Sequence, residues 1–371
     1  MDTRRQTIGR RGLLAGGAAA ALAGCATPAG PTTTPGTRAP DPPHQPGIVT
    51  APPAAAVFAA FDVRVPDRDA LAGLLRLIST QFTGARGEIL VSVGASLFDG
   101  RYGLGPRRPA GLSTMPSFPN DALDPAWCGG DLLLQVCTPD DAAAQATLAA
   151  IERAAGTGLV PRWRMPAFRQ ENTIAANGRP TTRNLFGFRE GMGNPDVRDA
   201  ATMAQLVWVA SGVGEPRWTA GGSYQVIRLV RFATQLWDRE PVSTQEAVFG
   251  RRRSDGVPLG RDTEPADFTY ADDPTGRFVA LDAHIRRANP RTPETAGSRI
   301  LRRGYSYRTS TDQGLVFVCF QQDLDKGFET VQRRLTGEAL DKYVLPYGGG
   351  YFFALPGAAP GEYLGEHLFC A

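Results

Sequence analysis

The stretch AVFAAFDVRVPDRDALAGLLRLISTQF, residues 56–82, is typical of a β-strand followed by an α-helix. Its first ten residues are mostly Val, Phe and Ala, whereas the rest has apolar residues at helical spacing after acids in the first turn. The same order returns at residues 131–155, 223–251 and 315–337. A strand followed by a helix therefore occurs four times, twice before residue 200 and twice after it.

Further strand-like runs, such as 87–98 and 349–356, fall between or after these pairs. Two β-α-β-β-α-β units in tandem account for the order, and a single doubly wound α/β sheet is the alternative. Long irregular insertions at 100–127 and 251–300 favour the tandem units. We therefore expect an α+β protein.

The composition excludes several classes of function. A net charge of +3 over 371 residues is too weak to indicate nucleic-acid binding. Its five cysteines form no CxxC pair, so neither a zinc site nor a thioredoxin-type motif is indicated. No GxGxxG opens a helix after a strand and no GxxxxGK[ST] occurs, so nucleotide binding has no support.

The first residues are typical of an export signal. IGRRGLLAGGAAAALAGCA, residues 8–26, contains a twin arginine before an apolar run that is too short to span a membrane. The run ends in Leu22-Ala23-Gly24-Cys25, which looks like a lipoprotein processing box. We expect a signal over 1–24, a lipid on Cys25 and a place in the cell envelope; the alternative is cleavage near Ala26 without a lipid.

A Pro- and Thr-rich segment follows the signal. Residues 31–47, PTTTPGTRAPDPPHQPG, have almost nothing to bury and predict a disordered tether. We place the tether at 25–52, the N-terminal domain at 53–205 and the C-terminal domain at 206–371.

A glycine-rich loop, NLFGFREGMGNP at residues 184–195, holds a single acid, Glu190. Glycine permits a positive φ or a close approach of the backbone to another group. Two interpretations follow: a tight turn with a solvated acid on its rim, or a loop that lies against a ligand and directs Glu190 at it.

Only one of the three histidines lies within the folded part and away from a terminus. His44 belongs to the tether and His367 lies four residues before the end, which leaves His284. One His cannot build a zinc site alone, but one axial His suffices for haem, because the porphyrin supplies four nitrogens. Arg302 follows eighteen residues later and has the charge to stabilise a breaking peroxide bond. The alternatives are a structural His and a surface Arg.

Together these segments resemble the dye-decolourising peroxidases, haem proteins built from two ferredoxin-like domains that form a dimeric α/β-barrel-like fold, with the haem in the C-terminal half. The similarity extends over nearly the whole folded part. It is densest in NLFGFREGMGNP, WTAGGSYQVIRLVR, WDREPVSTQEAVFGR, HIRRANPR, ILRRGYSY and PYGGGYFFALPG. The signal suits the exported twin-arginine branch of this family.

The resemblance implies roles for particular residues. His284 matches the proximal ligand of the iron in haem b (iron protoporphyrin IX), and Arg302 matches the distal Arg. Glu190 falls where the family's GxxDG motif has Asp, so that the motif here is GxxEG. The extra methylene bears on the rate more than on the chemistry, because proton transfer depends on reach before pKa. The family's haem-lining backbone positions match Gly191, Met192, Gly193, Asn289, Pro290 and Arg291, and Arg291 is expected to pair with a propionate.

The resemblance also implies a function and partners. We expect a peroxidase that reduces hydrogen peroxide through an oxoferryl intermediate and oxidises dyes, phenols or other organic electron donors. One alternative is a deferrochelatase-like, haem-handling component of iron uptake, with membrane components of that system as partners. Another is a haem-binding lipoprotein in which Glu190 has abolished turnover. A homodimer is also considered, nucleic acid is not expected, and the membrane is reached only through the lipid anchor.

Overall fold

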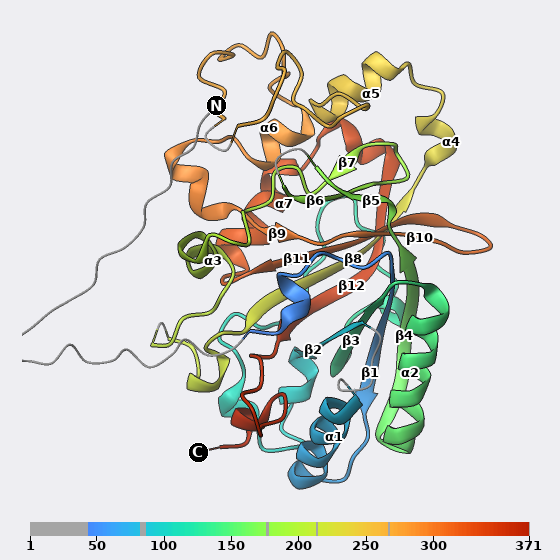
Figure 1. The fold of residues 1–371 in the computed structure, drawn as a ribbon, viewed down its shortest axis with the longest axis vertical. Coiled ribbons are helices and arrows are strands. Elements are labelled where there is room, and N and C mark those ends of the chain that lie inside the picture. The colour runs from blue at the N-terminus through green and yellow to red at the C-terminus, as the bar shows by residue number, and fades with distance from the viewer. Residues whose placement is uncertain (1–43, 82–86, 176–177, 213, 266–267, 371) are drawn as a thin grey trace, which may run out of the picture. The chain divides into compact units, whose positions relative to one another are not determined.

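The computed structural model describes residues 44–81, 87–175, 178–212, 214–265 and 268–370 (Figure 1). The expected signal at 1–24, the lipid-bearing Cys25 and the tether as far as residue 43 lie outside the described residues. The boundary expected between residues 205 and 206 stays a prediction.

Strands and helices alternate along the chain much as the sequence indicates. The strands are β1 (Ala55–Val63), β2 (Glu88–Gly94), β3 (Leu132–Thr138), β4 (Leu159–Phe168), β5 (Gln170–Ile174), β6 (Pro180–Arg183), β7 (Arg189–Glu190), β8 (Ser223–Phe232), β9 (Leu301–Arg302), β10 (Tyr305–Arg308), β11 (Gln313–Gln321) and β12 (Val344–Ala354). The α-helices are α1 (Arg68–Thr80), α2 (Asp141–Ala155), α3 (Ala200–Leu206), α4 (Thr234–Trp237), α5 (Val242–Phe249), α6 (His284–Ala288) and α7 (Thr330–Leu335).

One large antiparallel sheet contains the strands of both repeated units. Its order is β10-β4-β1-β3-β2-β12-β8-β11-β9, and β10 also pairs with β11. Each unit has the strand order of a ferredoxin-like fold: β4-β1-β3-β2 in the first and β12-β8-β11-β10 in the second. Because β10 pairs with both β4 and β11, the two units close into a ring of strands. The tandem arrangement is confirmed, and the doubly wound alternative is wrong because these neighbouring strands run antiparallel.

The apolar run at residues 56–61 is explained by burial on both faces of β1. Val57, Ala59 and Phe61 belong to the core that includes apolar residues of α1 and α2. The alternate residues, such as Phe58, belong to a second core with Phe320 and Phe352, from β11 and β12. A strand covered on both faces loses the alternation of apolar and polar residues.

Capping residues determine where the helices begin, and their apolar faces determine how they pack on the sheet. Asp67 and Asp140 cap α1 and α2 by accepting hydrogen bonds from backbone N–H groups of the first turn. These two helices flank β1–β4, whereas α4 to α7 gather at the other end, near β8 and β11 (Figure 1). In the described part of the insertion at 251–300, the one α-helix is the short α6, which begins at His284.

The tether ends earlier than the sequence indicates. Gln45 is buried, and its amide hydrogen-bonds to the backbone of Val91 and to the carbonyl of Leu355. Ile48 is also fully buried, and the His44 ring stacks on Trp208 at 3.8 Å between centroids. Residues 44–52 therefore pack against the domain, because a buried amide with three hydrogen bonds and an apolar side chain fix them there.

The described residues also bear on the membrane and the cysteines. Nowhere among them does a helix have the length and apolar character needed to cross a membrane. Within the same residues, Cys128, Cys137, Cys319 and Cys370 are free thiols.

Candidate active site

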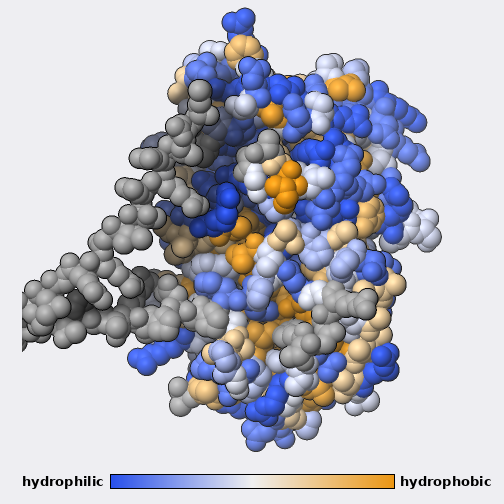
Figure 2. Space-filling view, in the orientation of Figure 1, coloured by the Kyte–Doolittle hydropathy of each residue, from blue (hydrophilic) through white to orange (hydrophobic). Residues whose placement is uncertain are grey.

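A cavity of about 500 Å³ lies over the second ferredoxin-like unit. Its walls come from β8 and β11 of the sheet, the loop at 184–195, α6 with the residues after it, and α7. Much of the lining is apolar: Phe186, Phe188, Val230, Phe232, Phe249, Ile285, Leu301, Leu315, Phe317, Phe328, Val331, Leu335 and Leu340. On the visible face, hydrophilic side chains gather over the half of the fold that holds α4 to α7 (Figure 2). Such a cavity suits a large, mostly apolar ligand with a few polar groups.

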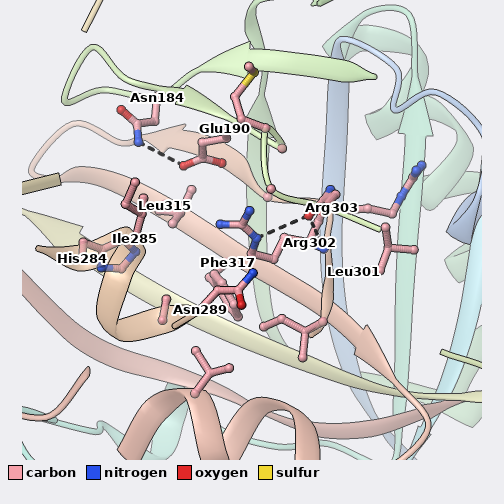
Figure 3. A pocket seen from close by; sticks show the side chains of 18 of the residues that line it. Asn184, Glu190, His284, Ile285, Asn289, Leu301, Arg302, Arg303, Leu315 and Phe317 are labelled. Atoms are coloured by element: carbon pink, nitrogen blue, oxygen red, sulfur yellow. Dashed lines mark hydrogen bonds between the residues drawn. The ribbon is translucent and has the colours of Figure 1, made fainter. Parts of the chain in front are cut away.

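Glu190 reaches this cavity from the end of the short strand β7. Its Oε1 accepts a hydrogen bond from Nδ2 of Asn184 at 3.1 Å (Figure 3). Asn184 is itself fixed, because its Oδ1 accepts from the N–H groups of Phe186 and Phe188. A Cβ on Gly304 would lie 3.0 Å from Glu190 Oε2, so the carboxylate rests against a residue that has no side chain. The loop therefore directs the acid into a cavity, as the second interpretation of its sequence expects.

Arg302 lies beside Glu190 and is held by one amide (Figure 3). Asn194 Oδ1 accepts from the backbone N–H and the Nε of Arg302, and Asn194 Nδ2 donates to the Arg302 carbonyl at 2.7 Å. Among the described residues, the two terminal nitrogens of Arg302 have no hydrogen-bond partner. Burial lowers the pKa of Arg302, and nearby Glu190 opposes this shift. Because a guanidinium group stays protonated in proteins, the side chain keeps its charge for a ligand in the cavity.

The glycines of the loop serve its own folding more than contact with a ligand. Gly187 and Gly191 have φ angles of 87° and 84°. A Cβ on Gly187 would clash with the guanidinium of Arg253, and one on Gly191 would lie 2.7 Å from the Pro180 carbonyl oxygen. Gly193 has no positive φ, yet Gly191, Met192 and Gly193 all line the cavity. The three expected positions thus border the cavity, while the glycine at 191 is required by the neighbouring strand.

His284, the first residue of α6, faces the cavity with one ring nitrogen already engaged. Its Nδ1 lies 2.7 Å from Oε2 of Glu338, a carboxylate that is almost fully buried. Between them a proton on Nδ1 satisfies both groups, which leaves Nε2 as the nitrogen with a free lone pair. This carboxylate–histidine pair is the arrangement that orients a histidine as a metal ligand.

The residues after His284 meet the expectations only in part. Asn289 and Arg291 line the cavity, but Pro290 is not among its lining residues in the described part of the chain. Arg291 forms an ion pair with Glu264, whose other oxygen bonds to Arg251, and Arg291 also lies over the ring of Phe268. One buried carboxylate therefore serves two arginines, which leaves one positive charge in the cluster, and a propionate that pairs with Arg291 would share this side chain with Glu264.

Arg299 is a better candidate for a ligand carboxylate. It lines the cavity, and no carboxylate of the described residues lies within 4.0 Å of it. Its Nε is buried without a hydrogen-bond partner. Burial lowers the pKa of Arg299, and the nearby charges of Arg179 and Arg291 lower it further. An anion in the cavity would relieve this accumulation of positive charge.

Sequence reasoning missed Asn184, Asn194, Glu338 and Arg299, together with Leu315 and Phe317 on the cavity floor. The two asparagines stand at either side of Glu190 in the quoted loop, and their position was a usable signal. Glu338 lies 54 residues after His284, and nothing in its own segment marks it.

The arrangement combines three chemical properties around one cavity. Glu190 can accept and return a proton, Arg302 can stabilise developing negative charge, and His284 Nε2 can donate a lone pair to a metal (Figure 3). The described part contains no group of three or more His, Cys, Asp or Glu side chains able to hold a metal ion. A metal that brings most of its own ligands, as iron in a porphyrin does, fits a single histidine. The apolar walls and Arg299 fit the flat ring and carboxylates of that group.

Comparisons with known proteins identify the family to which the chain belongs. Residues 45–169 match the family model described as Dyp-type peroxidase, N-terminal, and residues 181–359 match Dyp-type peroxidase, C-terminal. A deferrochelatase of Escherichia coli O6:K15:H31 is 43% identical, with 97% of this chain and 96% of the relative covered. A deferrochelatase of Escherichia coli O157:H7 is 44% identical, with 88% and 85% covered.

The chain is also similar to solved structures of DyP-type peroxidases. A DyP-type peroxidase from Cellulomonas bogoriensis superposes with a TM-score of 0.78 at 34% identity, covering 89% of this chain and 97% of that one. Ferric DtpA from Streptomyces lividans superposes with a TM-score of 0.78 at 33% identity, covering 92% and 99%.

The contact between Glu338 and His284 generates a first prediction. Glu338→Gln keeps the size of the side chain but removes the charge that makes the imidazole a stronger donor to ferric iron. If the variant loses a tenfold to hundredfold preference for ferric over ferrous haem, the reduction potential of the haem rises by about 60–120 mV. Spectroelectrochemical titration of the haem-loaded protein measures this potential.

Asp341→Asn is the matched control, because Asp341 also lines the cavity but accepts its hydrogen bond from the N–H of Gly337. Equal potentials in the Glu338→Gln variant and the parent protein would show that this carboxylate does not tune the histidine.

Proposed function

The chain belongs to the Dyp-type peroxidase family and is a haem-dependent peroxidase, and we propose that His284, Glu190 and Arg302 carry its chemistry. The cofactor is haem b, and the substrates are hydrogen peroxide and an organic reductant. The observation that supports these roles best is the convergence of three separate segments on one cavity, where they bring together a carboxylate, an arginine and a histidine oriented by Glu338.

The residues of the cavity divide the task of holding haem. His284 would hold the iron through Nε2, because Nδ1 is engaged by Glu338. The apolar walls, with Phe186, Leu315 and Phe317 among them, enclose the ring and exclude water. Arg299, which has no carboxylate partner among the described residues, pairs with a haem carboxylate in preference to Arg291, which already contacts Glu264. When bound, haem supplies the iron at which the peroxide O–O bond breaks and the capacity to store two oxidising equivalents.

Glu190 moves the proton that bond cleavage requires. Its Oε1 is engaged by Asn184, so Oε2 is the oxygen that accepts a proton from one end of hydrogen peroxide and returns it to the other, which leaves as water. Arg302 stabilises the negative charge that develops on the leaving oxygen, through terminal nitrogens that lack partners among the described residues. Asn194 fixes Arg302, so this charge is in place before peroxide arrives.

The proposed roles predict the behaviour of two variants. Glu190→Gln cannot accept a proton and Arg302→Leu removes the charge, so each is expected to slow the reaction with peroxide by about 10²–10⁴-fold. Stopped-flow absorbance of the Soret band after mixing with peroxide measures the rate.

Glu171→Gln serves as the control, because Glu171 is exposed, is not among the residues that line the cavity, and pairs with Arg183 and Arg189. Glu190→Asp restores the acid of the family motif and tests the extra methylene. Parent-like rates in both Glu190→Gln and Arg302→Leu would remove the roles assigned to these side chains.

A second candidate function is deferrochelation, the release of iron from haem while the porphyrin stays intact. The deferrochelatases that match at 43–44% identity over most of the chain favour it. Both functions need haem in the same cavity, so only the products separate them.

We expect turnover of the organic reductant with the haem retained. Haem-loaded protein is incubated with peroxide and a phenol, and both the oxidised phenol and the fluorescence of free protoporphyrin are measured. Stoichiometric metal-free porphyrin with little oxidised phenol would instead assign deferrochelation as the main activity.

For location and partners we propose export through the twin-arginine signal and a lipid anchor on Cys25 in the cell envelope. The arginine pair, the apolar run and the Leu-Ala-Gly-Cys box support this proposal. An iron-uptake membrane component and a homodimer remain part of the proposal. Labelling with radioactive palmitate tests the anchor, and an equal label on Cys25→Ser would contradict it.

A further inference from the structure

A second pocket, of about 600 Å³, opens at the surface between α4 and the turn that joins β10 to β11. A hydrogen bond of 2.7 Å from Gln313 Nε2 to Thr234 Oγ1 joins these two segments. Its lining is Arg231, Phe232, Ala233, Thr234, Gln235, Leu236, Arg239, Arg308, Thr309, Thr311, Asp312 and Gln313. We propose that this α4 pocket binds an anionic aromatic compound and places it to donate electrons to the enzyme, an inference that rests on the proposed peroxidase function.

The net charge of the pocket favours an anionic ligand. Three arginines and one aspartate line it, which leaves a surplus of two positive charges. Asp312 neutralises Arg231 in an ion pair of 2.6 Å. No carboxylate of the described residues lies within 4.0 Å of Arg239 or Arg308, and Arg308 donates from Nε to Gln313 Oε1. Two guanidinium groups are therefore available to a sulfonate or carboxylate.

The apolar side chains of the pocket favour a ligand with an aromatic ring. Leu236 is 44% exposed, although it is a large apolar side chain, and Phe232 lies in the wall. Guanidinium planes also stack on aromatic faces. A small inorganic anion would leave Leu236 uncovered, whereas an aromatic anion would contact Leu236 and the two arginines that lack a carboxylate partner.

An aromatic side chain is common to the linings of this pocket and of the active-site cavity. Phe232 lines both spaces, and its ring stacks on Phe186 with centroids 3.9 Å apart and planes inclined by 5°. Phe186 itself lines the active-site cavity. Trp237, at the end of α4, packs on Phe186 and donates from Nε1 to its carbonyl at 3.1 Å. Figure 1 places α4 directly after the end of β8, which carries Phe232.

The stacked rings of Phe232 and Phe186 allow a bulky donor to be oxidised without entering the cavity. Each bound donor loses one electron through the rings. Two donors are therefore oxidised for each hydrogen peroxide that takes up two electrons and two solvent protons and becomes two water molecules. The oxidised donor leaves from the open side of the pocket. Small neutral phenols, by contrast, have no need of the arginines.

The test uses haem-loaded full-length protein and the variant Arg239→Ala/Arg308→Ala, in which both side chains are exposed and outside the catalytic site. The control, Arg153→Ala/Arg217→Ala, changes the net charge equally at two exposed arginines that do not line either pocket. The probes are ABTS, an aromatic disulfonate, and guaiacol, a small neutral phenol. Equilibrium dialysis without peroxide gives the Kd of ABTS, and steady-state rates with peroxide give kcat/KM for both donors.

We expect the pocket variant to raise the Kd of ABTS about tenfold or more and to lower kcat/KM for ABTS by a similar factor. Guaiacol turnover, the Soret band and the control variant should remain as in the parent protein. An unchanged Kd would overturn the binding site, and a raised Kd with unchanged ABTS turnover would overturn its role as a donor site. Failure of the parent protein to oxidise either donor would refute the proposed function, while the Kd would still decide whether the pocket binds the anion.

Discussion

The hydrogen bond between Glu338 and Nδ1 of His284 is the contact on which the rest of the site depends. It assigns Nδ1 to the carboxylate and leaves Nε2 to the cavity, so the only free lone pair of the ring faces the space where a ligand fits. Without this buried acid the ring could turn or change its tautomer. The acid–arginine pair of Glu190 and Arg302 would then have no metal to act with. The chemistry of the cavity thus depends on a residue that acts through the histidine it orients.

Much of the fold follows from the sequence because it depends on local patterns. The strand and helix at residues 56–82 show their periods directly, and Asp67 marks where α1 begins. The closing of two units into one ring could not be read in this way. It depends on β10, a strand of four residues that pairs with both β4 and β11. Strand pairing across 137 residues, such as Ser306 with Phe168, leaves no local signal.

Some residues of the candidate site can likewise be recognised in the sequence, and others cannot. Glu190, His284 and Arg302 stand out because an acid in a glycine loop, a lone histidine and a following arginine are visible in the chain itself. Arg291 was expected to pair with a propionate, but the buried Glu264 that contacts both it and Arg251 lies 27 residues away in an irregular insertion. The free arginine, Arg299, looks like any other in an arginine-rich sequence. Whether an arginine lacks a carboxylate partner depends on packing and cannot be read from the sequence.

The most direct measurement concerns the bond between His284 and iron. The haem content of purified His284→Ala is determined as the pyridine haemochrome, and its spectrum is recorded with and without added imidazole. We expect a large loss of haem or a changed ferric spectrum, and partial recovery when imidazole occupies the vacated position beside Glu338. A variant that purifies with the same haem content, spectrum and peroxide reactivity as the parent protein would show that another residue holds the iron.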